Sequence, residues 1–174
     1  MQIELRDARC GDLVLFKGKG LIFSVLSFIL CLFDCKWRRL KWKPWHVGFL
    51  TFNNYGYWEL CESLKQGIKL TELSDYDPKD YRIYRWFHTP PTKNLILEYL
   101  GSHLHKRYDI AVYFWTGLSY LFRHFWNRPI KYLLDDRYTC WENVYHFADH
   151  CKKPICSDYD CPMINDLCQS LSVK

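Results

Sequence analysis

The first half of the chain alternates short apolar runs with turn residues, a pattern typical of β-strands. Strands are predicted over residues 13–16, 46–52, 57–63, 67–73 and 81–87. Asn53-Asn54-Tyr55-Gly56 supplies turn chemistry between the second and third of these, which are therefore expected to form a β-hairpin. Apolar residues then recur at helical spacing after Thr92 and from Thr139 to about His150. Several strands followed by helices predict an α+β fold.

Three further segments modify this picture. Residues 21–33 are almost entirely apolar but too few to cross a bilayer, which needs about 20 residues, so a buried helix is expected. The basic, tryptophan-rich residues 36–43 leave a second interpretation open, in which residues 21–45 contact a membrane surface. The aromatic-rich residues 108–134 are expected to be mostly helical and buried.

Length and composition indicate one folded domain. A chain of 174 residues suits a single domain, 1–174, with a helical and basic insertion at 20–44 and a Cys-rich segment at 151–174. Apolar residues make up 49% of the chain, enough to bury a core, which excludes global disorder. The net charge of +5 is too weak and too dispersed for a typical nucleic-acid binder, so no nucleic-acid partner is expected.

The cysteine count bears on the compartment. Nine cysteines cannot all pair within one chain, so at least one thiol is free. The first twelve residues show no apolar signal-peptide core. A reducing compartment, such as the cytoplasm, is therefore expected, although a phage or viral setting is also compatible with this pattern. A reactive cysteine becomes the natural candidate for chemistry.

Tyr138-Thr139-Cys140-Trp141-Glu142 places a cysteine at the start of a predicted helix. Thr139 followed by Glu142 three residues later, just before an apolar run, is a capping box that starts the helix at Cys140. The unpaired N–H groups and the positive dipole end of a helix favour a thiolate at this position. Cys140 is thus a candidate nucleophile, with a buried structural cysteine as the alternative interpretation.

A thiolate nucleophile needs a base, and the predicted hairpin supplies one together with a carboxylate. With Asn53-Asn54-Tyr55 as a three-residue loop, Phe52 pairs with Gly56. His46 then falls directly opposite Glu62, on the same face of the sheet. In that position Glu62 can accept the imidazole N–H and orient the ring. The alternative interpretation is a satisfied strand histidine beside a solvated strand end, and a register shift of one residue would separate the two side chains.

Other polar clusters are weaker candidates. His146 and His150 have a spacing that can bind a metal, but the cysteines that follow contain no CxxC pair, so free thiols are favoured over a zinc site. His103 and His105 are expected to bond to carbonyls at a helix end. The sequence has no GxGxxG, P-loop, HExxH or GxSxG motif, which excludes several enzyme classes. No cofactor is expected at the candidate site.

Several short motifs occur in an order that resembles a known family. They are GDLVLF (11–16), WHVGFL (45–50), ELCES (59–63), GIKLTEL (67–73), RYD (107–109), YTCWENV (138–144) and PMINDLCQS (162–170). Together they resemble the circularly permuted NlpC-type papain-fold hydrolases, which include YiiX-like proteins and, more distantly, the lecithin:retinol acyltransferase group. In the permuted order the histidine strand precedes the cysteine helix, as His46 precedes Cys140 here.

The resemblance implies a papain-like antiparallel sheet packed against the helix that carries the cysteine. By matched position it makes Cys140 the nucleophile, His46 the general base and Glu62 the orienting acid. It implies a thiol hydrolase acting on peptide amide bonds, including those of cell-wall peptides. The acyltransferase-like relatives imply lipid ester or thioester substrates at a membrane surface instead. A catalytically silent binding protein on the same fold is a third alternative, and Trp141 departs from the family's small residue.

Overall fold

The computed structural model describes residues 1–21, 24, 27–28, 42–104, 106–108 and 137–153. A six-stranded antiparallel sheet organises them, with the strand order β1-β6-β2-β3-β4-β5. Its strands are β1 (Gln2–Ile3), β2 (Leu13–Lys17), β3 (Pro44–Phe52), β4 (Trp58–Leu64), β5 (Gly67–Glu72) and β6 (Tyr81–Tyr84). A separate parallel pair consists of β7 (Arg107–Tyr108) and β8 (Arg137–Tyr138). Two 3-10 turns, η1 and η2, span Leu5–Asp7 and Leu73–Asp75.

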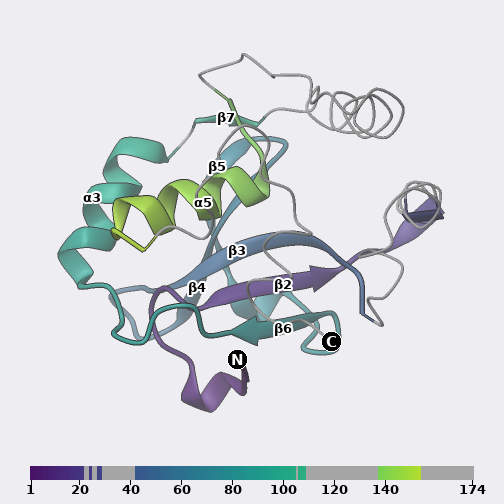
Figure 1. The fold of residues 1–174 in the computed structure, drawn as a ribbon, viewed down its shortest axis with the longest axis horizontal. Helices are drawn as coiled ribbons and strands as arrows, with labels where there is room; N and C mark the ends of the chain where they lie inside the picture. The colour runs from purple at the N-terminus through teal and green to yellow at the C-terminus, as the bar shows by residue number, and fades with distance from the viewer. Residues whose placement is uncertain (22–23, 25–26, 29–41, 105, 109–136, 154–174) are drawn as a thin grey trace.

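Two α-helices lie on one face of the sheet. Helix α5 (Cys140–His150) crosses β3 and β4, and α3 (Lys93–His103) lies beside it (Figure 1). The ring of Phe49 on β3 stacks on Phe147 of α5 with 3.7 Å between centroids, and Tyr99 of α3 meets Phe49 edge-on. A second apolar cluster on the opposite face joins β2, β3, β4 and β6 to η2. The protein is therefore α+β, as predicted.

Most predicted elements are present. The five predicted strands correspond to β2 through β6, although β6 ends at Tyr84 rather than at residue 87. The two predicted helices correspond to α3 and α5, and Thr92 and Thr139 cap them. The short strands β1, β7 and β8 were not expected from the sequence pattern.

Of the predicted helix at 21–33, only Leu21, Ser24, Ser27 and Phe28 are described, and all four are helical. Leu21 and Phe28 are 80% and 65% exposed, so the expected burial is wrong for these two side chains. Of the predicted helical region 108–134 only Tyr108 is described, and it lies in strand β7, paired with Tyr138 of β8, instead of in a helix. Residues 109–134, and residues 154–174 of the Cys-rich segment, lie outside the described residues. Among the residues that are described, no helix is long and apolar enough to cross a membrane.

The predicted register of the β3–β4 hairpin is wrong by two positions. Phe52 pairs with Trp58 instead of Gly56, and Glu62 pairs with Gly48 instead of His46. The three-residue loop is 54–56, because the Asn53 side chain accepts the backbone N–H groups of residues 55 and 57 and closes the turn one residue later. Gly56 takes the left-handed position of that loop, with φ of +86°, instead of entering the strand.

The correction preserves the shared face. Side chains alternate along a strand with a period of two, so a shift of two positions keeps His46 and Glu62 on the same side of the sheet. They become diagonal neighbours, which long side chains can still bridge.

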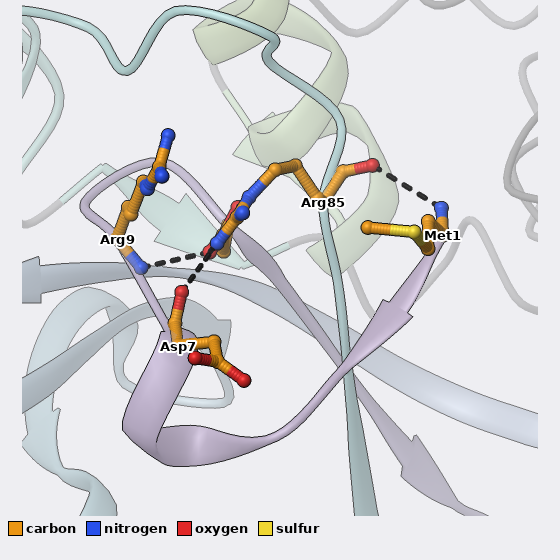
Figure 2. Close-up of polar contacts among 5 residues, drawn as sticks. Met1, Asp7, Arg9 and Arg85 are labelled. Atoms are coloured by element: carbon orange, nitrogen blue, oxygen red, sulfur yellow. Dashed lines mark hydrogen bonds and ion pairs between the residues drawn. The ribbon is translucent and has the colours of Figure 1, made fainter.

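The N-terminal segment is fastened to the end of β6 by a polar cluster (Figure 2). The Arg85 guanidinium donates to both oxygens of the buried Asp12 carboxylate, at 3.3 and 3.1 Å, and to the Asp7 carbonyl. The Arg9 backbone N–H donates to the same carboxylate at 2.8 Å, and the Met1 amino group donates to the Arg85 carbonyl. These contacts hold the N-terminal segment at the β1 edge of the sheet, which is opposite the β5 edge.

Candidate active site

The candidate nucleophile lies at the first position of α5. Thr139 is the N-cap: its hydroxyl oxygen accepts the Glu142 N–H, and the Glu142 carboxylate accepts the Thr139 N–H at 2.8 Å. The Thr139 hydroxyl also donates to this carboxylate at 2.7 Å. The predicted capping box is therefore confirmed, and it fixes the start of the helix at Cys140.

The Cys140 side chain is fully buried at the start of α5. The Cys140 backbone N–H has no hydrogen-bond acceptor among the described residues, as expected for the first residue of a helix. The Cys140 sulfur therefore lies at the positive end of the helix dipole and next to a free donor. Both features stabilise negative charge on an oxygen that is bound beside the sulfur.

His46 reaches Glu62 through a short hydrogen bond. The His46 Nε2 lies 2.6 Å from the Glu62 Oε2, and the Glu62 side chain has no exposed surface. The pairing register between β2 and β3 shifts by one residue next to His46: Phe16 pairs with His46, but the next residue of β2, Lys17, pairs with Pro44. Trp45 is thus an extra residue in β3, a β-bulge directly before His46. Bulges increase the local twist and redirect neighbouring side chains, and they are common beside active sites.

The electrostatics connect His46 to Cys140 as well. Burial is the largest influence on the His46 ring and disfavours its charged form. The charge and hydrogen bond of Cys140, followed by those of Glu62, outweigh burial and raise the pKa of His46 to about 10. Because Nε2 faces Glu62, Nδ1 is the nitrogen left for the Cys140 thiol. The structure therefore brings together the three residues proposed from the sequence.

Glu62 is held by a residue that the sequence did not single out. The Tyr76 hydroxyl donates to the Glu62 Oε1 at 2.6 Å, on the oxygen that His46 does not use. Burial alone would raise the pKa of the Glu62 carboxyl, but the hydrogen bonds and charge of its neighbours lower it below its usual value. Tyr76 follows η2, and no spacing rule links it to Glu62, so only the folded chain reveals the contact.

The other described thiols lack such a setting. Cys61 is buried on β4, and burial raises its pKa to about 12 despite a hydrogen bond from Asn143. Burial also raises the pKa of the half-buried Cys151, to about 11, and that of Cys10. No histidine contributes to the pKa shift of any of the three. Cys140 is thus distinguished from these thiols by its neighbours.

The remaining sequence candidates do not form a second site among the described residues. No group of three or more His, Cys, Asp or Glu side chains there could hold a metal. His103 stacks on the Tyr99 ring and has its Nδ1 3.0 Å from the Tyr99 carbonyl, as expected near a helix end. His146 and His150 lie on the last turns of α5, while His105 and the later cysteines lie outside the described residues.

Two of the described tryptophans, Trp42 and Trp141, are buried. Trp42 is 7% exposed, with the Arg82 guanidinium over its ring at 4.8 Å, so it does not belong to an exposed basic surface. Trp141, the residue after the nucleophile, is 6% exposed and belongs to the core.

No protein-family model matches the chain, and no curated protein matches it significantly. Function is therefore inferred from the geometry of Cys140, His46 and Glu62, together with the resemblance of the short motifs that contain them.

Proposed function

We propose that the protein is a thiol hydrolase that acts through an acyl-enzyme on amide bonds of peptides. The observation that carries this proposal is the 2.6 Å contact of the His46 ring with the buried Glu62, with Cys140 at a helix start close enough to raise the pKa of His46. A histidine that stays protonated beside a thiol favours a thiolate–imidazolium pair. The resemblance to permuted NlpC-type papain-fold hydrolases supports the same assignment and the papain-like form of the α+β fold.

In the proposed mechanism the Cys140 thiolate attacks the carbonyl carbon and forms a C–S bond. The oxyanion that develops accepts a hydrogen bond from the Cys140 N–H, which has no other described partner. The His46 imidazolium gives its proton to the departing amine as the C–N bond breaks. Water then attacks the thioester, His46 takes a proton from it, and the carboxylic acid leaves as the C–S bond breaks. Glu62 keeps the imidazole oriented throughout.

The substrate class follows from the resemblance, which implies peptide amides, including those of cell-wall peptides. A second candidate is acyl hydrolysis or transfer on lipid esters or thioesters at a membrane surface. The exposed apolar side chains of Leu21 and Phe28 favour this second candidate, because both lie in the segment expected to contact a membrane. A catalytically silent binding protein is the alternative that the experiment below separates from both.

The test is site-resolved alkylation by iodoacetamide between about pH 5 and pH 9, read by mass spectrometry, in wild type and His46→Ala. We expect Cys140 to react at a rate nearly independent of pH in wild type. In His46→Ala the rate at pH 6 should fall about 100-fold, toward the thiolate fraction of a free thiol with a pKa of ~8.5. Cys61 and Cys151 serve as internal controls, because burial raises their pKa values and no histidine lowers them.

The shape of the pH profile matters more than the absolute rate, because Cys140 is fully buried. Slow opening of the site lowers the alkylation rate equally at every pH. At pH values below its pKa, an ordinary thiol reacts about tenfold faster for each unit by which the pH increases. If the alkylation rate of Cys140 in wild type rises about tenfold per pH unit, and His46→Ala does not change this rise, the result would contradict the hydrolase proposal and favour a binding protein. A flat profile that depends on His46 would justify assays with peptide amides and with lipid esters.

A further inference from the structure

Glu62 is a carboxylate that has been removed completely from water. Its two oxygens are divided between two donors, Oε2 to the His46 ring and Oε1 to the Tyr76 hydroxyl, each at 2.6 Å. A buried carboxylate normally becomes neutral unless hydrogen bonds or opposite charges stabilise its ionised form. The histidine can donate a hydrogen bond from Nε2 in both of its states, but it supplies an opposite charge only as the imidazolium, and it loses that charge during the proposed reaction. A donor that never loses its proton is therefore the more constant support.

Tyr76 meets that requirement. Burial, followed by the hydrogen bond and charge of Glu62, raises the pKa of the phenol above its ordinary value, so the hydroxyl stays protonated over the whole working range. The ring is held by packing on Phe16, with centroids 4.7 Å apart, and the Tyr76 N–H caps η2 by donating to the Leu73 carbonyl. Phe16 also contacts the His46 ring at 5.6 Å, so one apolar side chain supports both donors.

We propose that Tyr76 is a positioning residue of the site: its hydroxyl fixes the orientation and the charge of Glu62, and through Glu62 the orientation of His46. This inference rests on the proposed role of the Cys140–His46–Glu62 group and extends it by one layer. Tyr76 does not touch the reacting atoms. Its contribution is to keep Glu62 ionised while His46 passes its proton to the leaving group and becomes neutral.

The chain offers a matched control. Tyr81 on β6 also packs against Phe16, at 5.8 Å between centroids, and burial alone raises its pKa. Its hydroxyl has no hydrogen-bond partner among the described residues. Tyr76→Phe and Tyr81→Phe therefore remove the same atom from two rings on the same neighbour, and only the first removes a donor to Glu62.

The experiment measures the pKa of the Glu62 carboxyl by NMR on protein labelled with ¹³C at the glutamate carboxyl, with Glu62→Gln to assign the signal. In Tyr76→Phe we expect this pKa to rise by about one to two units, the range for loss of a hydrogen bond to a charged group. Tyr81→Phe should leave it within a few tenths of wild type. An unchanged Glu62 pKa in Tyr76→Phe would overturn the proposal.

If Tyr76→Phe does not fold, wild type still provides a test. With ¹³C at the tyrosine Cζ, the Tyr76 signal should shift as Glu62 titrates and should lose that step in Glu62→Gln. A signal that stays flat through the Glu62 titration would count against the contact.

None of these measurements needs a substrate, so they separate this inference from the proposed function. If the Glu62 pKa rises in Tyr76→Phe but Cys140 is unreactive in wild type, the role of Tyr76 in holding Glu62 stands and the proposed hydrolase activity is contradicted. If Cys140 is reactive but the Glu62 pKa does not change in Tyr76→Phe, the hydrolase proposal stands and the role of Tyr76 is contradicted. Once a substrate is found, Tyr76→Phe should lower kcat about tenfold with little change in KM, because the substrate does not contact Tyr76.

Discussion

Two buried carboxylates of this protein, Asp12 and Glu62, are held in different ways. The Asp12 side chain is 3% exposed and the Glu62 side chain 0%, and each is satisfied by hydrogen bonds to both of its oxygens. Asp12 binds the Arg85 guanidinium and the Arg9 backbone N–H, which are fixed donors. Glu62 binds a histidine and a tyrosine, of which the histidine can lose its proton near neutral pH in an ordinary setting.

The difference distinguishes a carboxylate held by fixed donors from one whose partner can change its protonation, as the proposed function requires. The hydrogen bond to Asp12 raises the pKa of Arg85 further above its already high value, so the guanidinium keeps its charge and the contact serves to fasten the N-terminal segment. The Glu62 partner His46 adjoins a thiol at a helix start, so a proton can move within the group. Burial of a carboxylate is thus no sign of chemistry by itself; the nature of its partner decides.

The largest effect is expected from breaking the structural pair. Asp12→Asn leaves the Arg85 guanidinium without its counter-charge and should lower the free energy of unfolding by about 3 kcal/mol, at the low end for buried pairs because Arg85 is 18% exposed. Urea unfolding at neutral pH measures this loss. Alkylation of Cys140 should change by less than about twofold; a large change there would contradict the separation of the two regions.

Breaking the functional pair should have the opposite signature. Glu62→Gln retains the size of the side chain but removes the charge that favours the His46 imidazolium, so alkylation of Cys140 at pH 6 should slow by about 10- to 100-fold. The assay is the same site-resolved alkylation, with Asp12→Asn as the comparison variant. Equal rates in the two variants would remove Glu62 from the site.

The pH dependence of stability sharpens the comparison further. The pKa of His46 is raised from 6.5 to about 10, so the stability that its protonated form contributes is complete below about pH 6.5 and is lost as the pH rises toward 10. The difference in unfolding free energy between wild type and His46→Gln should therefore shrink over this range. The difference between wild type and Asp12→Asn should stay constant, because Arg85 remains charged. Urea titrations at several pH values between these limits test both expectations.

The smallest effect concerns the helix start that presents the sulfur. Thr139→Ala removes the hydroxyl that accepts the Glu142 N–H and should lower the free energy of unfolding by about 1 kcal/mol. Because the cap also fixes where α5 begins, alkylation of Cys140 should slow severalfold as well. Thr92→Ala at the start of α3 is the matched control, since Thr92 caps a helix that carries no nucleophile. An equal effect of both variants on alkylation would contradict a link between this cap and the site.

The candidate site residues could be predicted from a local capping pattern and from the alternation of side chains along a strand. The cap at Thr139 is a four-residue pattern, so it could be identified without the fold. The pairing of His46 with Glu62 depended on a hairpin register that was wrong by two positions. It survived because an even shift preserves the side of the sheet; an error of one would have lost it.

The amino-acid sequence by itself determined the order of β2 to β6, α3 and α5, the class of the fold and the helix start at Cys140, because alternation, helical spacing and capping act over a few neighbouring residues. Only the tertiary structure decided the hairpin register, the bulge before His46, the complete burial of Glu62 and its second donor, Tyr76. These features join residues from separate strands and turns. They are set by how distant segments pack against one another, which no local pattern records.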